Sequence, residues 1–148
     1  MDHFDYRDGE LYAEDLPVQE IASAVGTPFY CYSSATLIRH YKAFSDAMSG
    51  LDAKIYYAVK ANSNVALVRL LAKQGAGADI VSGGELAIAQ AAGVAPDNVV
   101  FSGVGKKREE MRAGLDAGIG QFNVESEAEL EALSEVASGM GATAHIGI

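Results

Sequence analysis

The chain has 148 residues, 49% of them hydrophobic and 21% charged, so it can bury a core and is unlike a disordered segment. With 20 acidic and 11 basic residues, its net charge of −9 argues against partners such as nucleic acid or an anionic membrane surface. The single cysteine, Cys31, excludes an internal disulfide, and three scattered histidines show no metal-ligand spacing. The sequence shows no leader pattern and no apolar run of about 18 residues, so we expect a cytoplasmic protein.

The sequence before residue 34 predicts an arm followed by one strand. Residues 2–26 are a polar lead-in that includes a short helix over residues 18–25. Residues 27–33 (TPFYCYS) are rich in aromatic residues and predict a strand, in which Cys31 has a small apolar role. The next segment predicts a helix with one broad apolar face, made by Leu37, Ile38, Tyr41, Phe44 and Met48.

The rest of the chain repeats one pattern at a nearly constant period. Short apolar runs rich in β-branched or aromatic residues start 24, 20, 22 and 22 residues apart. They predict strands over residues 54–59, 78–81, 98–101, 120–124 and 142–148. The segments between them have helical apolar spacing, with Asn64 and the Ser126–Glu129 capping box as helix starts. Glycines stand where these helices should end: Gly75, Gly93, Gly118 and Gly139.

This alternation predicts an α/β fold with a parallel sheet, either closed as a barrel or open and doubly wound. The period alone does not distinguish the two. A (βα)8 barrel needs eight units and about 200 residues or more, whereas this chain reaches only a fifth strand. We therefore expect the N-terminal part of such a barrel. The competing fold is a complete flavodoxin-like domain, which usually has a helix over its last strand.

Two glycine segments and one acidic segment have simple structural explanations. The segment 103–107 matches neither a P-loop nor a dinucleotide fingerprint, because Val100, Lys107 and Arg108 stand where those motifs need other residues. Gly83–Gly84 could offer backbone N–H groups to an anion, although a tight turn is the commoner reason for such a pair. The acidic residues between positions 125 and 135 predict a solvated helix face.

Lys60 is the strongest candidate for chemistry. Reactive groups of parallel α/β folds gather at the carboxyl ends of the strands, where this sequence also offers Asn62, the 82–85 loop, Ser102 and Asn123. Lys60 directly follows an apolar strand, and a lysine at such a position rarely contributes to stability. Partial burial would favour a free amine that attacks a carbonyl to form a Schiff base. The alternative is a purely structural lysine that pairs with Asp79 or extends to solvent.

Four segments carry a resemblance to a known family. Residues 57–62 (YAVKAN) and 77–85 (GADIVSGGE) resemble the fold-type III pyridoxal-phosphate decarboxylases, and among them the diaminopimelate decarboxylase family. The likeness continues in order and spacing through residues 99–106 (VVFSGVGK) and 122–126 (FNVES). It covers essentially the whole chain, but only about the first third of a full-length member of the family.

The resemblance implies that Lys60 is catalytic and carries pyridoxal 5′-phosphate, and that Asp79 and Glu85 bind the same cofactor, with no metal. It implies an N-terminal arm and strand of a second β-domain (1–33) and an incomplete (βα)8 barrel (34–148). The implied reaction converts meso-2,6-diaminopimelate, a small amino-acid substrate, to L-lysine in a homodimeric full-length enzyme. The chain alone is expected to be inactive, because further cofactor-binding groups of the family lie beyond Ile148.

Three alternatives stay open at this point. A sister decarboxylase would act on ornithine, arginine or carboxynorspermidine. A non-catalytic single-barrel carrier of pyridoxal phosphate would also present a lysine after its first strand, although the predicted strand and helix over residues 27–48 argue against it. A self-contained five-stranded binding module would leave Lys60 as a charge at the rim of the sheet.

Overall fold

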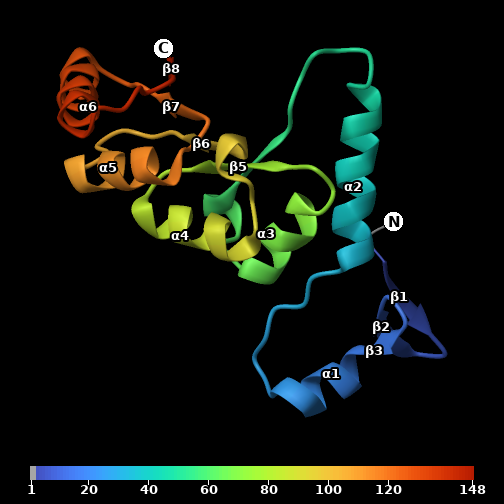
Figure 1. The fold of residues 1–148 in the computed structure, drawn as a ribbon. Helices are drawn as coiled ribbons and strands as arrows, with labels where there is room; N and C mark the ends of the chain where they lie inside the picture. The colour runs from blue at the N-terminus through green and yellow to red at the C-terminus, as the bar shows by residue number, and fades with distance from the viewer. Residues whose placement is uncertain (1–2) are drawn as a thin grey trace. The chain divides into compact units, whose positions relative to one another are not determined.

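The computed structural model describes residues 3–148 and contains two compact units, Met1–Leu51 and Asp52–Ile148. The N-terminal unit holds a three-stranded antiparallel sheet of order β1-β2-β3, formed by β1 (Phe4–Arg7), β2 (Glu10–Ala13) and β3 (Leu16–Pro17). Two helices follow, α1 (Val18–Val25) and α2 (Ser34–Ala47) (Figure 1). Across the described residues, none of the helices has both the length and the apolar character that a membrane span requires.

The antiparallel sheet replaces most of the polar lead-in that the sequence predicted. Arg7 pairs with Glu10, so Asp8 and Gly9 form a two-residue hairpin turn, and both have the positive φ that the favoured turns of this length demand (51° and 86°). Asp-Gly between alternating strands is a hairpin signal, and our prediction overlooked it. The predicted helix over residues 18–25 is confirmed as α1.

The predicted strand over residues 27–33 is wrong. Within the described residues this segment pairs with no strand, and regular strand structure requires a neighbour that exchanges backbone hydrogen bonds. Its last residue instead starts α2, because the Ser33 hydroxyl accepts a hydrogen bond from the Thr36 N–H. The Glu14 carboxylate then accepts hydrogen bonds from the Ser33 and Ser34 hydroxyls and the Ala35 N–H, at 2.8 to 3.0 Å.

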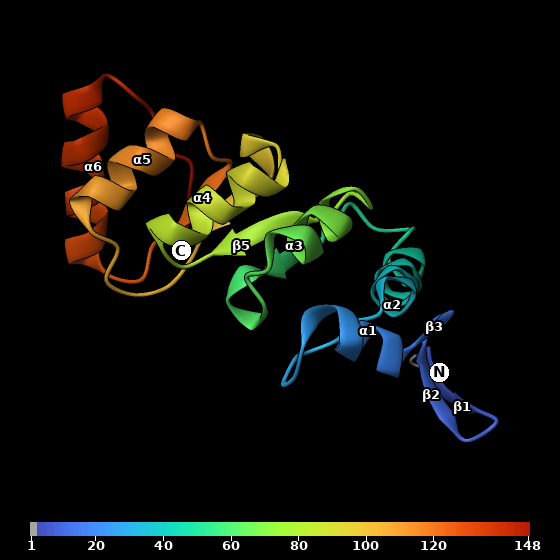
Figure 2. The same cartoon turned by 90° about the horizontal axis from the view of Figure 1, so that it is seen from below.

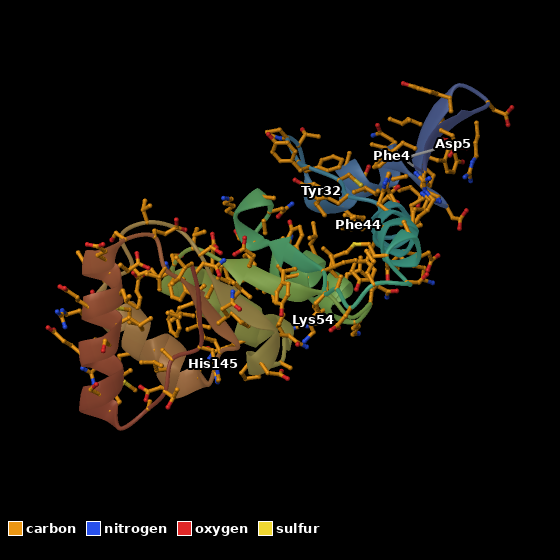
Figure 3. The ribbon with its side chains drawn as sticks, turned by 90° about the horizontal axis from the view of Figure 1, so that it is seen from above. Phe4, Asp5, Tyr32, Phe44, Lys54 and His145 are labelled. Atoms are coloured by element: carbon orange, nitrogen blue, oxygen red, sulfur yellow. The ribbon has the colours of Figure 1, made fainter. Side chains whose placement is uncertain are left out.

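The second unit repeats the βα pattern that the sequence predicted. Its strands are β4 (Tyr56–Ala58), β5 (Gly77–Ile80), β6 (Val99–Phe101), β7 (Gln121–Asn123) and β8 (Ile146–Gly147). The helices between them are α3 (Val65–Ala72), α4 (Gly83–Ala92), α5 (Arg108–Ala117) and α6 (Glu127–Met140), with short 3-10 turns η1 (Val59–Ala61) and η2 (Pro96–Asn98). Four of the five strands are shorter than predicted, whereas β5 keeps its predicted length and begins one residue earlier. The last strand is shortened most, so that His145 lies exposed just before β8 (Figure 3).

The order of the strands distinguishes the two folds that the period left open. All neighbours are parallel and follow the chain, in the order β4-β5-β6-β7-β8. A doubly wound sheet would reverse this order at a switch point and place helices on both faces. Here the four helices follow one another along one side of the sheet (Figures 1 and 2), which is the arrangement of successive units of a βα barrel.

The core of this unit lies between the sheet and its helices. Its largest fully buried side chains include Phe101 and Phe122, whose rings stack with centroids 5.9 Å apart. The predicted start of α3 is confirmed, since Asn64 accepts a hydrogen bond from the Ala66 N–H at 2.9 Å. Gly93 and Gly118 end α4 and α5 in the left-handed conformation, as predicted.

Gly139 does not end the last helix. It lies inside α6, and the left-handed residue that ends this helix is Gly141, two positions later. Both glycines suit the sequence pattern, and only the backbone shows which one has the positive φ, 63° at Gly141. Helix ends are the least certain part of a pattern-based prediction for this reason.

Candidate functional site

One face of the five-stranded sheet carries polar side chains, and the register of the strands determines which of them lie side by side. Backbone register places Ala58 beside Asp79, Asp79 beside Val100, and Val100 beside Gln121. The neighbours of Asp79 in β5, Ala78 and Ile80, are fully buried on the opposite, helix-covered face. A recess of about 330 Å³ lies on the polar face and is lined by Tyr56, Asp79, Val100, Ser102, Gln121 and Asn123.

A chain of hydrogen bonds links Asp79 of β5 to the next two strands of the sheet, β6 and β7. The Ser102 hydroxyl donates to Asp79 Oδ1 at 2.5 Å, and the Asn123 amide Nδ2 donates to Ser102 Oγ at 2.9 Å. Gln121 Nε2 in turn donates to Asn123 Oδ1 at 2.7 Å. The structure therefore brings Ser102 and Asn123, which the sequence placed at separate strand ends, together with Asp79, and it fixes the orientation of the Asp79 carboxylate.

Lys60 lies in the turn η1 directly after β4, at the carboxyl end of the sheet. It is exposed, which corrects the expected partial burial, because only the preceding Val59 packs into the core. The alternative of a structural pair with Asp79 is not found among residues 3–148, where Asp79 bonds to Ser102 instead. No hydrogen bond or ion pair to a described residue engages the Lys60 amine, so the amine is available to a ligand.

Glu85 and Gly83 are already engaged in holding the loop after β5. Glu85 Oε2 accepts a hydrogen bond from the Val81 N–H at 2.8 Å, while its own N–H donates to Ser82 Oγ. The Gly83 N–H, which the sequence offered as a donor to an anion, instead donates to Glu110 Oε1 at 2.8 Å. This bond is the main reason why the pKa of Glu110 lies below its ordinary value.

The acidic segment of the last helix is not wholly solvated. Glu129 is buried and accepts from the Lys106 ammonium at 2.7 Å, with side-chain exposures of 8% and 1%. Lys106 follows Gly103 and Gly105, in a segment that we compared only with phosphate-binding motifs. The sequence pattern therefore gave no reason to expect a buried ion pair here. Glu127 and Glu131 of the same helix are exposed, as predicted.

Comparison with known protein families shows to which family this domain belongs. The family described as the pyridoxal binding domain of pyridoxal-dependent decarboxylases matches residues 34–148. The chain belongs to this family. The predicted α/β barrel class is thereby confirmed, and so is the predicted pyridoxal cofactor, since the matched domain is described by its binding of pyridoxal.

Individual members of the pyridoxal-dependent decarboxylase family are similar over the whole chain. Diaminopimelate decarboxylase of Pseudomonas aeruginosa is 49% identical over 100% of this chain and 36% of its own length. Among solved structures, AQ1208 from Aquifex aeolicus is 48% identical with a TM-score of 0.93, covering 99% of this chain and 36% of its own. Diaminopimelate decarboxylase from M. jannaschii in co-complex with L-lysine is 38% identical, with a TM-score of 0.94, and covers 99% of this chain and 35% of its own. The chain thus spans about a third of the length of these relatives.

The residues of the decarboxylase domain fit the cofactor chemically. Pyridoxal is an aldehyde, and an unpaired primary amine such as that of Lys60 is the group that bonds to an aldehyde carbon. The neighbouring strand contributes a carboxylate, Asp79, whose Oδ1 is fixed by Ser102. The amine of Lys60 and the oriented carboxylate of Asp79 come from adjacent strands of one sheet. Together they are polar groups suited to bind a polar ring cofactor.

Proposed function

We propose that the complete protein containing this chain decarboxylates meso-2,6-diaminopimelate to L-lysine with pyridoxal 5′-phosphate. The observation that supports it most is the 49% identity to a diaminopimelate decarboxylase along the whole chain, together with an unpaired Lys60 at the end of β4. The site comprises Lys60 as the catalytic residue, with Asp79 and Glu85 as cofactor-binding residues.

Each of these residues has a distinct task in the proposal. Lys60 would hold the cofactor through its amine and would be the group placed to donate a proton to the substrate carbon that loses its carboxylate. When bound, pyridoxal phosphate supplies the electron sink for that carbanion. Asp79, held by Ser102, would orient the cofactor ring. Glu85, whose Oε2 accepts the Val81 N–H and so fixes the loop after β5, would bind the cofactor from that loop.

The proposal extends to organisation and partners. We assign residues 34–148 to the cofactor-binding barrel and residues 1–33 to an arm that belongs with a second, β-rich domain. The enzyme acts as a homodimer in the cytoplasm on a small amino-acid substrate. The support for the boundary at residue 34 is the family match, which begins there.

The decisive assay supplies the complete protein with pyridoxal phosphate and meso-diaminopimelate and measures released CO₂ and L-lysine. Lys60→Ala is expected to abolish both products. Lys73→Ala is the matched control, because Lys73 is an exposed lysine of the same βα unit, and it should retain full activity. Turnover of ornithine or arginine in preference to diaminopimelate would refute the proposed substrate, and cofactor binding without any CO₂ release would refute the enzyme.

A further inference from the structure

Lys106 is a buried charged residue, with a side chain only 1% exposed, that the proposed chemistry does not use. Its ammonium donates to Glu129 Oε1 at 2.7 Å, to the Gly103 carbonyl at 2.8 Å and to the Asn123 carbonyl at 2.6 Å. All three of its N–H donors are therefore used. Its nitrogen also lies over the Phe101 ring, 5.8 Å from the ring centroid.

Stability alone is a poor explanation for such a group. Burying two opposite charges costs desolvation energy, and replacing a buried pair by apolar residues of similar volume is often neutral or stabilising. The three acceptors, moreover, come from three separate segments: the loop after β6, the end of β7 and helix α6. Lys106 thus fixes the backbone at the carboxyl ends of two neighbouring strands.

These two strand ends carry the hydrogen bonds that orient Asp79. Gly103 directly follows Ser102, and Ser102 donates to Asp79 Oδ1. Asn123, whose carbonyl Lys106 holds, donates to Ser102 through its side chain. The ammonium therefore holds the backbone on both sides of the Asn123–Ser102 contact, without touching the recess itself.

We propose that Lys106 is a positioning residue for the cofactor pocket, which sets the orientation of the Asp79 carboxylate through Asn123 and Ser102. This inference rests on the proposed function, since it assigns Asp79 to the cofactor. Without the ammonium, the Gly103 and Asn123 carbonyls lose a shared donor. Ser102 and Asn123 are then free to shift, and the Asp79 carboxylate loses its fixed direction.

The test separates positioning from stability with three variants of the complete protein. Lys106→Met removes the ammonium but leaves the Glu129 carboxylate buried and unpaired, so this variant should unfold more easily. Lys106→Met/Glu129→Met removes both charges, keeps the net charge and should regain stability. The matched control is Arg108→Met/Glu135→Met, which removes an ion pair of similar length (2.6 Å) whose side chains are 57% and 66% exposed.

The readouts are the denaturation midpoint, the dissociation constant of pyridoxal phosphate and the pH profile of the visible absorption of the bound cofactor. In metal sites, mutating a residue that holds a ligand side chain in place changes metal affinity by about 10- to 100-fold. By analogy, we expect about tenfold weaker cofactor binding and a shifted pH profile in the double variant. The control should match the unsubstituted protein in all three.

Two results would overturn the inference in distinguishable ways. A stable double variant with unchanged cofactor affinity and pH profile would show that Lys106 is only structural, and the proposed function would stand. An unsubstituted complete protein that binds no pyridoxal phosphate would refute the proposed function and, with it, this inference.

Discussion

Two helical glycines provide a controlled test of how tightly helix α5 packs against the sheet. Gly114 lies in α5 and Gly139 in the last turn of α6, so replacing either by alanine gains helix propensity, up to about 0.5–1 kcal/mol. A Cβ on Gly139 would meet nothing within 4 Å. A Cβ on Gly114 would lie 2.8 Å from Phe122 Cζ and 3.1 Å from Ile119 Cδ1. The two variants therefore differ chiefly in the steric contact.

The Phe122 ring has little room to give way, because it is 2% exposed and stacks on Phe101. Overpacking a dense core costs about 1–3 kcal/mol of stability. Because both variants gain helix propensity, we expect their free energies of unfolding to differ by about this overpacking cost. Urea denaturation followed by circular dichroism measures it in the complete protein. Gly139→Ala should be slightly stabilised and Gly114→Ala destabilised. Equal midpoints for the two would refute the packing that we describe.

Three further predictions concern single side chains around the site. Because backbone hydrogen bonds lower the folded-state pKa of Glu110, its stabilising effect is fully present above its ordinary pKa of 4.5 and is lost as the pH falls from there through the lowered folded-state pKa. Glu110→Gln should therefore lower urea midpoints at neutral pH but match the unsubstituted protein in acid; a constant difference would contradict this. Asn64→Ala should cost about 1 kcal/mol at the start of α3, and Asn64→Asp should cost clearly less by the same assay. Ser102→Ala, which removes the donor to Asp79, should weaken pyridoxal phosphate binding in a spectroscopic titration, and unchanged affinity would argue against Asp79 as a cofactor residue.

The repeating unit of this fold was predictable because its signals are local. Strand type, helix spacing and the caps at Asn64, Gly93 and Gly118 each depend on a few adjacent residues. The N-terminal strand over residues 27–33 failed because strand structure depends on a partner that no local pattern contains. The choice between barrel and doubly wound sheet likewise needed the strand order, which is a long-range property.

The candidate site was predictable in its position but not in its contacts. Sequence placed Lys60, Ser102 and Asn123 at strand ends, yet the bonds from Ser102 to Asp79 and from Asn123 to Ser102 join residues more than 20 positions apart. Buried Lys106 was missed for a related reason. Its partner Glu129 lies 23 residues later in an acidic run typical of a solvated helix face, and only the fold brings the two together.

The most direct test of the central claim asks which residue bonds to the cofactor. The complete protein, loaded with pyridoxal phosphate, is reduced with borohydride, digested and analysed by mass spectrometry. We predict that the added pyridoxyl mass lies on the peptide that contains Lys60, and that Lys60→Ala carries no such mass at any lysine. A label on another lysine, with Lys60 unmodified, would contradict the account.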